Sequence, residues 1–113
     1  MRVAICTQEQ SADPLVDERF GRCRYYAVVE TETGVTEYMS NEAYDQQGAG
    51  VKAARTILKA GVEAVVVGNI GPKAFEILTK AGITVYGGLN GTLSATLEQM
   101  RQGRLEKLQE ANG

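Results

Sequence analysis

The chain has 113 residues, of which 43% are hydrophobic and 23% are charged, and its formal net charge is −2. This length suits one domain with its own core, and the negative charge argues against a general nucleic-acid-binding protein, which is usually basic. No apolar run approaches the roughly 20 residues of a membrane span, and the N-terminus lacks the pattern of a signal peptide. We therefore expect a single domain over residues 1–113, located in the cytoplasm, that binds neither nucleic acid nor membrane.

The chain contains no histidine and only two cysteines, Cys6 and Cys23. The lack of histidine excludes Ser-His-Asp and Cys-His catalysis and the commonest zinc-ligand sets. A Walker A motif is absent, and the sequence GNIGP does not match the G-x-G-x-x-G dinucleotide fingerprint. The acidic residues fall in predicted loops, so a two-metal nuclease site is unsupported. These absences indicate that the protein is not an enzyme.

The first half of the sequence predicts a strand, a long loop and a hairpin. Arg2–Thr7 has the pattern of a short apolar strand, and a polar loop, Gln8–Phe20, follows it. The β-rich segments Cys23–Glu30 and Val35–Met39 are separated by a short turn, which is typical of an antiparallel hairpin. A polar loop, Asn41–Gln47, leads into the second half.

The second half repeats a pattern of strand, glycine turn and helix. Ala64–Val67 is apolar without polar alternation, as expected for a strand that is buried on both faces of a parallel sheet. The other predicted elements are a last strand, Ile83–Tyr86, and helices at Val51–Ala60, Pro72–Ala81 and Thr92–Gln102. Because right-handed crossovers join parallel strands, the sum is a mixed five-stranded α/β sheet with about three helices on its faces. The last eight or so residues, roughly, are expected to fray.

One edge of this sheet is expected to gather groups that bind an anion. Ligands of open α/β sheets bind beyond the carboxyl ends of the parallel strands, where helix N-termini present free N–H groups. Guanidinium groups also suit an anion. The candidate residues at this edge are Arg19, Gly21, Arg22, Arg24, Gly48, Gly50, Asn69 and Gly71. The alternative is that the glycines only form turns and that the arginines are a solvated rim.

Cys23 lies between two of these arginines, Arg22 and Arg24. Nearby positive charge favours the thiolate, which is the form that binds metal. Cys23 is therefore a candidate soft ligand for iron, copper or molybdenum–sulfur species. The alternative is a small residue that packs inward where a strand begins. Cys6, in an apolar strand, is expected to be a buried core residue.

The segment Asp17–Tyr26, DERFGRCRYY, resembles the D-x-R-F-G-R-x-x-Y-F segment of the dinitrogenase iron-molybdenum cofactor biosynthesis family. This family includes the NifX-like and NafY-like carriers and the C-terminal domain of NifB. The similarity covers nearly the whole chain, to Gly103 and Leu105. Its further motifs, in order, are Gly48-Ala49-Gly50, Gly61-Val62, Gly68-Asn69-Ile70-Gly71-Pro72, Ala74 and Gly82-Ile83-Thr84-Val85-Tyr86.

The resemblance implies a ribonuclease-H-like fold and a non-catalytic role. Such a protein transiently holds an anionic iron–sulfur or molybdenum–iron–sulfur cluster, or its precursor, and passes it from a donor protein to an acceptor protein. The resemblance also places the arginines and Cys23 near the cluster. Since this chain lacks the histidine that some relatives use, Cys23 and electrostatic capture remain as the means of holding it.

Several points stay open at this stage. A Mo–Cu sulfur cluster is equally compatible with the resemblance, and a role in nitrogen fixation does not follow from it. We expect a monomer or a weak homodimer. Two other functions compete with the carrier: a phosphate or nucleotide sensor, or small enzyme, that uses the same turns, and a protein-interaction module in which the loop Gln8–Arg22 meets a partner.

Overall fold

The computed structural model describes all 113 residues, and they form a five-stranded sheet in the order β3-β2-β1-β4-β5. The strands are β1 (Arg2–Thr7), β2 (Tyr25–Glu30), β3 (Thr36–Ser40), β4 (Ala64–Val66) and β5 (Thr84–Tyr86). β1 pairs antiparallel with β2, which pairs antiparallel with β3, whereas β1 and β4, and β4 and β5, pair parallel. The predicted mixed sheet, with its hairpin and its parallel strands, is confirmed.

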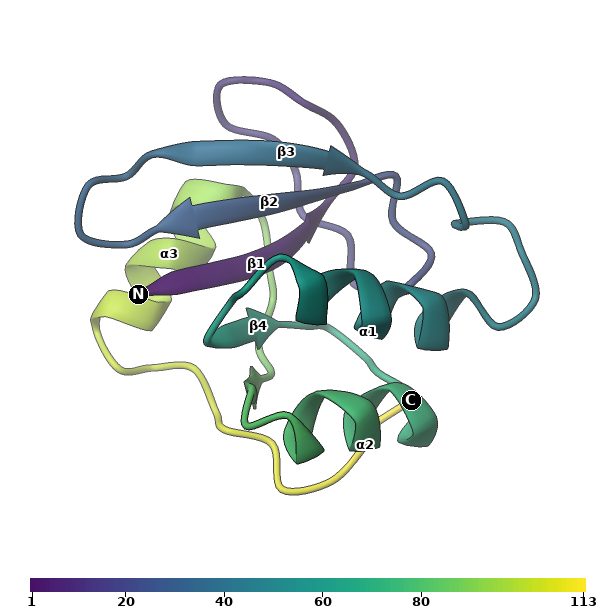
Figure 1. Cartoon of the computed structure of the whole chain (residues 1–113). Helices are drawn as coiled ribbons and strands as arrows, with labels where there is room; N and C mark the ends of the chain where they lie inside the picture. Colours follow the sequence, from purple (N-terminus) through teal and green to yellow (C-terminus); the bar gives the residue numbers. More distant parts are fainter.

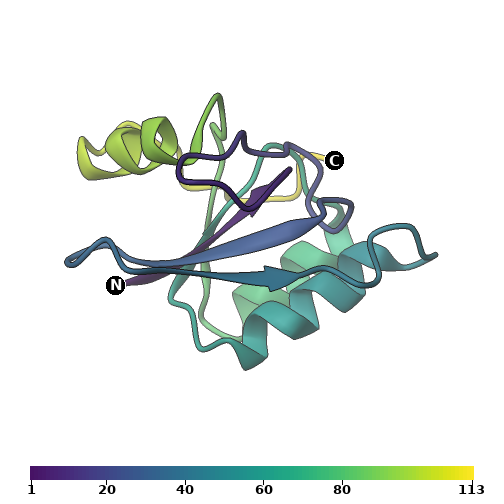
Figure 2. The same cartoon turned by 90° about the horizontal axis from the view of Figure 1, so that it is seen from above.

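Three helices cover the two faces of the sheet. They are α1 (Ala49–Lys59), α2 (Pro72–Lys80) and α3 (Leu93–Arg101). α1 and α2 lie side by side on one face, and α3 lies on the other (Figures 1 and 2). None of the three is long and apolar enough to cross a membrane.

The strands alternate their side chains between two hydrophobic layers. In β1, Ala4 and Cys6 face the layer under α1 and α2, whereas Val3 and Ile5 face the layer under α3. Both layers are apolar, so a central strand needs no polar positions. This explains why the run Ala64–Val67 has no polar alternation.

Two element boundaries matter for the candidate site. β2 begins at Tyr25 rather than at the predicted Cys23, and α1 begins at Ala49, with Gly48 as its N-cap. Residues 21–24 therefore belong to a connection, not to a strand. This connection lies at the end of the sheet where β1 finishes (Figure 1).

The segment 104–113 docks onto the body of the protein, in contrast to the expected fraying. The N–H of Leu108 donates to the carbonyl of Val85 at 2.8 Å, which extends the edge of β5. Asn112 clamps the turn after β4: its Nδ2 donates to the Gly68 carbonyl at 3.0 Å, and its Oδ1 accepts from the N–H of Ile70 at 2.9 Å. The tail thus reaches the edge where the candidate residues gather.

Asn112→Ala is expected to lower the free energy of unfolding by about 1–2 kcal/mol, because each of the two side-chain hydrogen bonds contributes on the order of 1 kcal/mol. The N–H of Ile70 loses its acceptor and should exchange with solvent faster. Thermal unfolding and native-state hydrogen exchange measure these effects. The control is Asn90→Ala, an exposed asparagine whose side chain makes no hydrogen bond. Equal exchange at Ile70 in both variants would contradict the clamp.

Candidate functional site

The chain returns to the end of β1 after a loop and then forms the segment Asp17–Arg24, which we call the arginine segment. The N–H of Asp17 donates to the Cys6 carbonyl at 2.9 Å, and the N–H of Val16 donates to the Gly91 carbonyl at 3.0 Å. These bonds attach the start of the segment to β1 and to the turn before α3. The arginine segment therefore lies at the carboxyl ends of the parallel strands, where ligands of such sheets bind.

Two glycines let the main chain of the arginine segment lie directly against its neighbours. A Cβ on Gly68 would be 2.6 Å from the Cα of Glu18, and a Cβ on Gly21 would be 2.6 Å from the Cα of Gly50. Gly21 also has a φ of +92°, which side-chain-bearing residues rarely adopt. The segment is thus wedged between the turn after β4 and the first turn of α1.

Hydrogen bonds join the arginine segment to the same turn. The N–H of Asn69 donates to the Glu18 carbonyl at 2.8 Å, and the N–H of Phe20 donates to the Asn69 carbonyl at 3.3 Å. Arg19 and Asn69 form a parallel bridge, and the exposed Gly71 is the N-cap of α2. The expected meeting of the arginines with the glycine turns is therefore observed, although no ligand tests what they bind.

Some main-chain donors that the sequence suggested as free are already used. The N–H of Asn69 bonds to Glu18, and the N–H of Ile70 bonds to the side chain of Asn112. The turn after β4 is thus less of an anion cradle than its glycines indicate. An anion at this edge would depend chiefly on the arginine side chains.

Arg19 forms a close ion pair with Asp17. Its Nε donates to Oδ1 of Asp17 at 3.1 Å and its Nη2 donates to Oδ2 at 2.9 Å, while its backbone N–H also bonds to Oδ1. Burial by itself would raise the pKa of the Asp17 carboxyl, but the hydrogen bonds and charge of Arg19 outweigh it, so the pKa is lowered. The positive charge of Arg19 is therefore largely compensated.

Arg22 and Arg24 are both exposed and lie against one residue of the β3–α1 connection, Tyr44. The guanidinium carbon of Arg24 lies 4.4 Å from the centre of the Tyr44 ring, a cation–π contact. Nη1 of Arg22 donates to the Tyr44 carbonyl at 3.3 Å. Neither guanidinium forms an ion pair with a carboxylate, so both keep their charge for a ligand.

Cys23 points into the protein, not toward the arginines beside it. Its exposed fraction is 0%, and it belongs to the hydrophobic layer under α1 and α2 together with Cys6. Burial raises the pKa of the Cys6 thiol, and the buried hydroxyl of Tyr26 has no hydrogen-bond partner. The expectation of a thiol at the surface is not met, because the layer beneath the segment is apolar. The role of Cys23 as a metal ligand stays a prediction, and the site described here does not use it.

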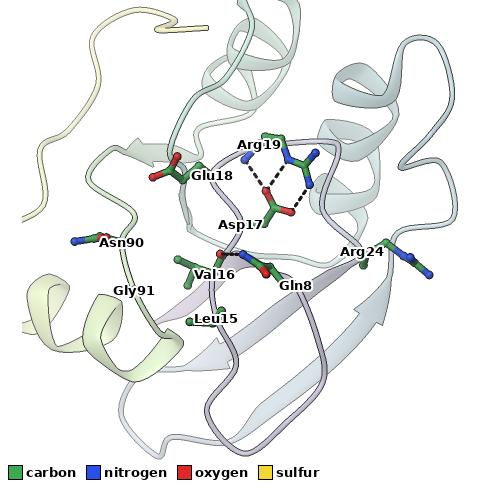
Figure 3. Close-up of a pocket in the computed structure, with 9 residues that line it drawn as sticks. All are labelled: Gln8, Leu15, Val16, Asp17, Glu18, Arg19, Arg24, Asn90 and Gly91. Atoms are coloured by element: carbon green, nitrogen blue, oxygen red, sulfur yellow. Dashed lines mark hydrogen bonds and ion pairs between the residues drawn. The ribbon is translucent and has the colours of Figure 1, made fainter.

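An open hollow of about 610 Å³ lies beside the arginine segment (Figure 3). Glu18 and Arg24 stand on opposite sides of it, and Arg24 is directed away from its centre. The lining residues are Gln8, Leu15, Val16, Asp17, Glu18, Arg19, Arg24, Asn90 and Gly91. Gln8 and Asn90 were not candidates from the sequence. The rule that ligands bind beyond the carboxyl ends of parallel strands could have found them, since both follow such strands.

The side chains at this edge do not form a metal-coordinating set. No group of three or more cysteines, aspartates and glutamates that could hold a metal ion occurs anywhere in the chain. The donors that the arginine segment does present are guanidinium groups. Such a set fits a negatively charged molecule held by charge and hydrogen bonds rather than by coordinate bonds.

Comparison with known proteins places this geometry in context. Residues 1–103 match the family model described as dinitrogenase iron-molybdenum cofactor. An uncharacterized protein of Methanocaldococcus jannaschii is 32% identical over 96% of this chain and 92% of its own length. The structure of the apo form of the orange protein from Desulfovibrio gigas superposes with a TM-score of 0.92 at 34% identity, covering 99% of this chain and 96% of that one.

Two further structures support the fold. A Thermotoga protein described as a candidate NifB protein has a TM-score of 0.85 at 34% identity and covers 99% of this chain and 97% of its own. A candidate dinitrogenase protein of Methanocaldococcus jannaschii has a TM-score of 0.70 at 19% identity, over 97% of this chain and 96% of its own, and shows the shared fold alone.

Gly68→Ala is expected to destabilise the protein by roughly 1–3 kcal/mol, because the new methyl group would overlap the main chain of Glu18, which cannot move aside easily. Gly71→Ala is the matched control: it lies in the same turn, with a φ of −77° and open space around it. Denaturant unfolding of both variants measures the difference. Equal stabilities would show that the close approach of Glu18 and Gly68 is not required.

Arg19→Met is expected to raise the pKa of Asp17, because burial then acts with less opposition. In the wild type, the lowered pKa means that Asp17 adds stability above its unfolded pKa of about 3.9, and this stability is lost as the pH falls through the folded value. The variant should therefore lose relative stability near neutral pH and less of it in acid. Carboxyl NMR titration and unfolding at several pH values test this, with the exposed Arg55→Met as control.

Proposed function

Because this chain belongs to the dinitrogenase iron-molybdenum cofactor family, we propose that it binds an anionic metal–sulfur cluster as cargo and hands it to an acceptor protein. The cargo is of the iron–sulfur or molybdenum-containing kind, Mo–Cu sulfur clusters included. The orange protein is described in its apo form, a term for a protein without its ligand, and the proposal brings ligand binding of that kind to this chain.

One observation carries the proposal: Arg22 and Arg24 are exposed, unpaired with carboxylates and held side by side on Tyr44. They lie on a segment that is fixed at the ligand-binding edge of the sheet. Two guanidinium groups present several N–H donors and two full charges to a sulfur-rich anion. The adjoining hollow has the volume of ordinary small-ligand sites, which is roughly 300–1,000 Å³.

The lack of a coordinating side-chain set suits a carrier. A cluster held by charge and hydrogen bonds can leave without the breaking of metal–protein bonds, and affinity lost at the acceptor is recovered there by true ligands. Residues of this chain would hold the cargo by its outer atoms and keep it oriented. No catalytic step is required, in keeping with the lack of histidine.

Anaerobic titration with the tetrathiomolybdate ion, followed by its optical absorption, tests the proposal. Arg22→Ala/Arg24→Ala is expected to bind roughly 10- to 30-fold more weakly, because each exposed charge contributes about 1 kcal/mol at contact distance. The matched control is Arg55→Ala/Lys59→Ala, which removes the same charge from an exposed part of α1. Equal losses in the two double variants would indicate only a general charge effect.

Two further arms separate the alternatives. Cys23→Ala is expected to bind like the wild type, since the thiol is buried; a large loss with an intact fold would restore Cys23 as a ligand. Inorganic phosphate is the competitor: if phosphate raises the melting temperature and tetrathiomolybdate does not, a phosphate sensor replaces the carrier.

A further inference from the structure

The side chain of Asn41 is a buried polar group that lies directly beneath the arginine segment. It follows β3, and its exposed fraction is 7%. Its Nδ2 donates one hydrogen bond to the Gly21 carbonyl at 2.9 Å and another to the Cys23 carbonyl at 2.7 Å. Its backbone N–H donates to the Arg24 carbonyl at 2.9 Å. One residue thus binds three of the four carbonyls from Gly21 to Arg24.

These bonds decide which way the arginine segment faces. A carbonyl that accepts a hydrogen bond from a buried amide must point toward the interior, so its negative end is withdrawn from the surface. The side chains of Arg22 and Arg24 are exposed on the opposite side. A primary amide is well suited to this task because it offers two N–H donors on one nitrogen without adding charge.

Tyr44, three residues farther along the same connection, holds the side chains of the two arginines. Its ring stacks on Arg24, and its carbonyl accepts the hydrogen bond from Arg22. The connection between β3 and α1 therefore fixes both the main chain and the guanidinium groups (Figure 1). Groups that are already in place lose less conformational entropy when a ligand binds.

We infer that Asn41 and Tyr44 are positioning residues that turn Arg22 and Arg24 outward and hold them together for an anionic ligand. This inference rests on the proposed function, since it concerns the same arginines. It adds a role for the β3–α1 connection, which the sequence presents only as a polar loop. Neither residue supplies the charge that attracts the ligand; both set where that charge is.

The test compares Asn41→Ala and Tyr44→Ala with the wild type in titrations with tetrathiomolybdate at several salt concentrations. Asn41→Ala is expected to bind at least 10-fold more weakly, and Tyr44→Ala about 3- to 10-fold. Both variants keep Arg22 and Arg24, so the slope of affinity against salt should stay near the wild-type value. Arg22→Ala/Arg24→Ala should reduce that slope, because charges are then removed. Tyr44→Phe, which keeps the ring and the carbonyl, should recover most of the affinity lost in Tyr44→Ala.

A loss of stability alone must be distinguished from a loss of position. Val29→Ala, in the buried end of β2 far from Arg24, serves as a destabilised control that should bind like the wild type. Wild-type affinity in Asn41→Ala or in Tyr44→Ala would overturn the inference and leave the proposed function intact. If Asn41→Ala does not fold, Tyr44→Ala and Tyr44→Phe decide it. If the wild type itself fails to bind tetrathiomolybdate, the proposed function fails, and the inference falls with it.

Discussion

The candidate site depends on two places where main chain packs on main chain with no side chain between. At Gly68 the partner is Glu18, and at Gly21 the partner is Gly50. Any larger residue would push the segment away from the sheet, because the atoms in the way belong to the backbone. A connection of irregular structure thereby acquires the precision of the sheet and helices that flank it, which is what a binding site on a loop requires.

The same constraint separates two kinds of chemistry along three consecutive residues. Arg22 and Arg24 face solvent, whereas Cys23 between them faces the apolar layer under α1 and α2. In an extended chain, neighbouring side chains point to opposite sides, so charge outside and thiol inside come from one geometry. The arginines that made the thiol look reactive in the sequence are therefore on the other side of the backbone. The surface they form attracts anions without offering a bond to metal.

The sequence predicted the elements whose pattern is local and missed the contacts that are not. The apolar run Ala64–Val67 and the glycine turns could be interpreted directly, because both layers of core demand such residues. The direction of Cys23 depended on where β2 begins, and a shift of two residues was enough to change its surroundings. The bonds of Asn112 join residues 42 and 44 positions apart, and nothing near the tail signals them. Side-chain amides that bond to distant carbonyls have no periodic pattern.

The charge that a ligand meets at this edge is set by orientation rather than by number. The hollow is lined by two acidic and two basic side chains, and the whole chain carries a net charge of −2. Asp17, however, is buried against Arg19, and Glu18 stands across the hollow from Arg24 (Figure 3). Asn41 draws the nearby carbonyls inward. Because Coulomb attraction over a few ångströms outweighs that from screened charges farther away, an acidic protein can present a local site for an anion.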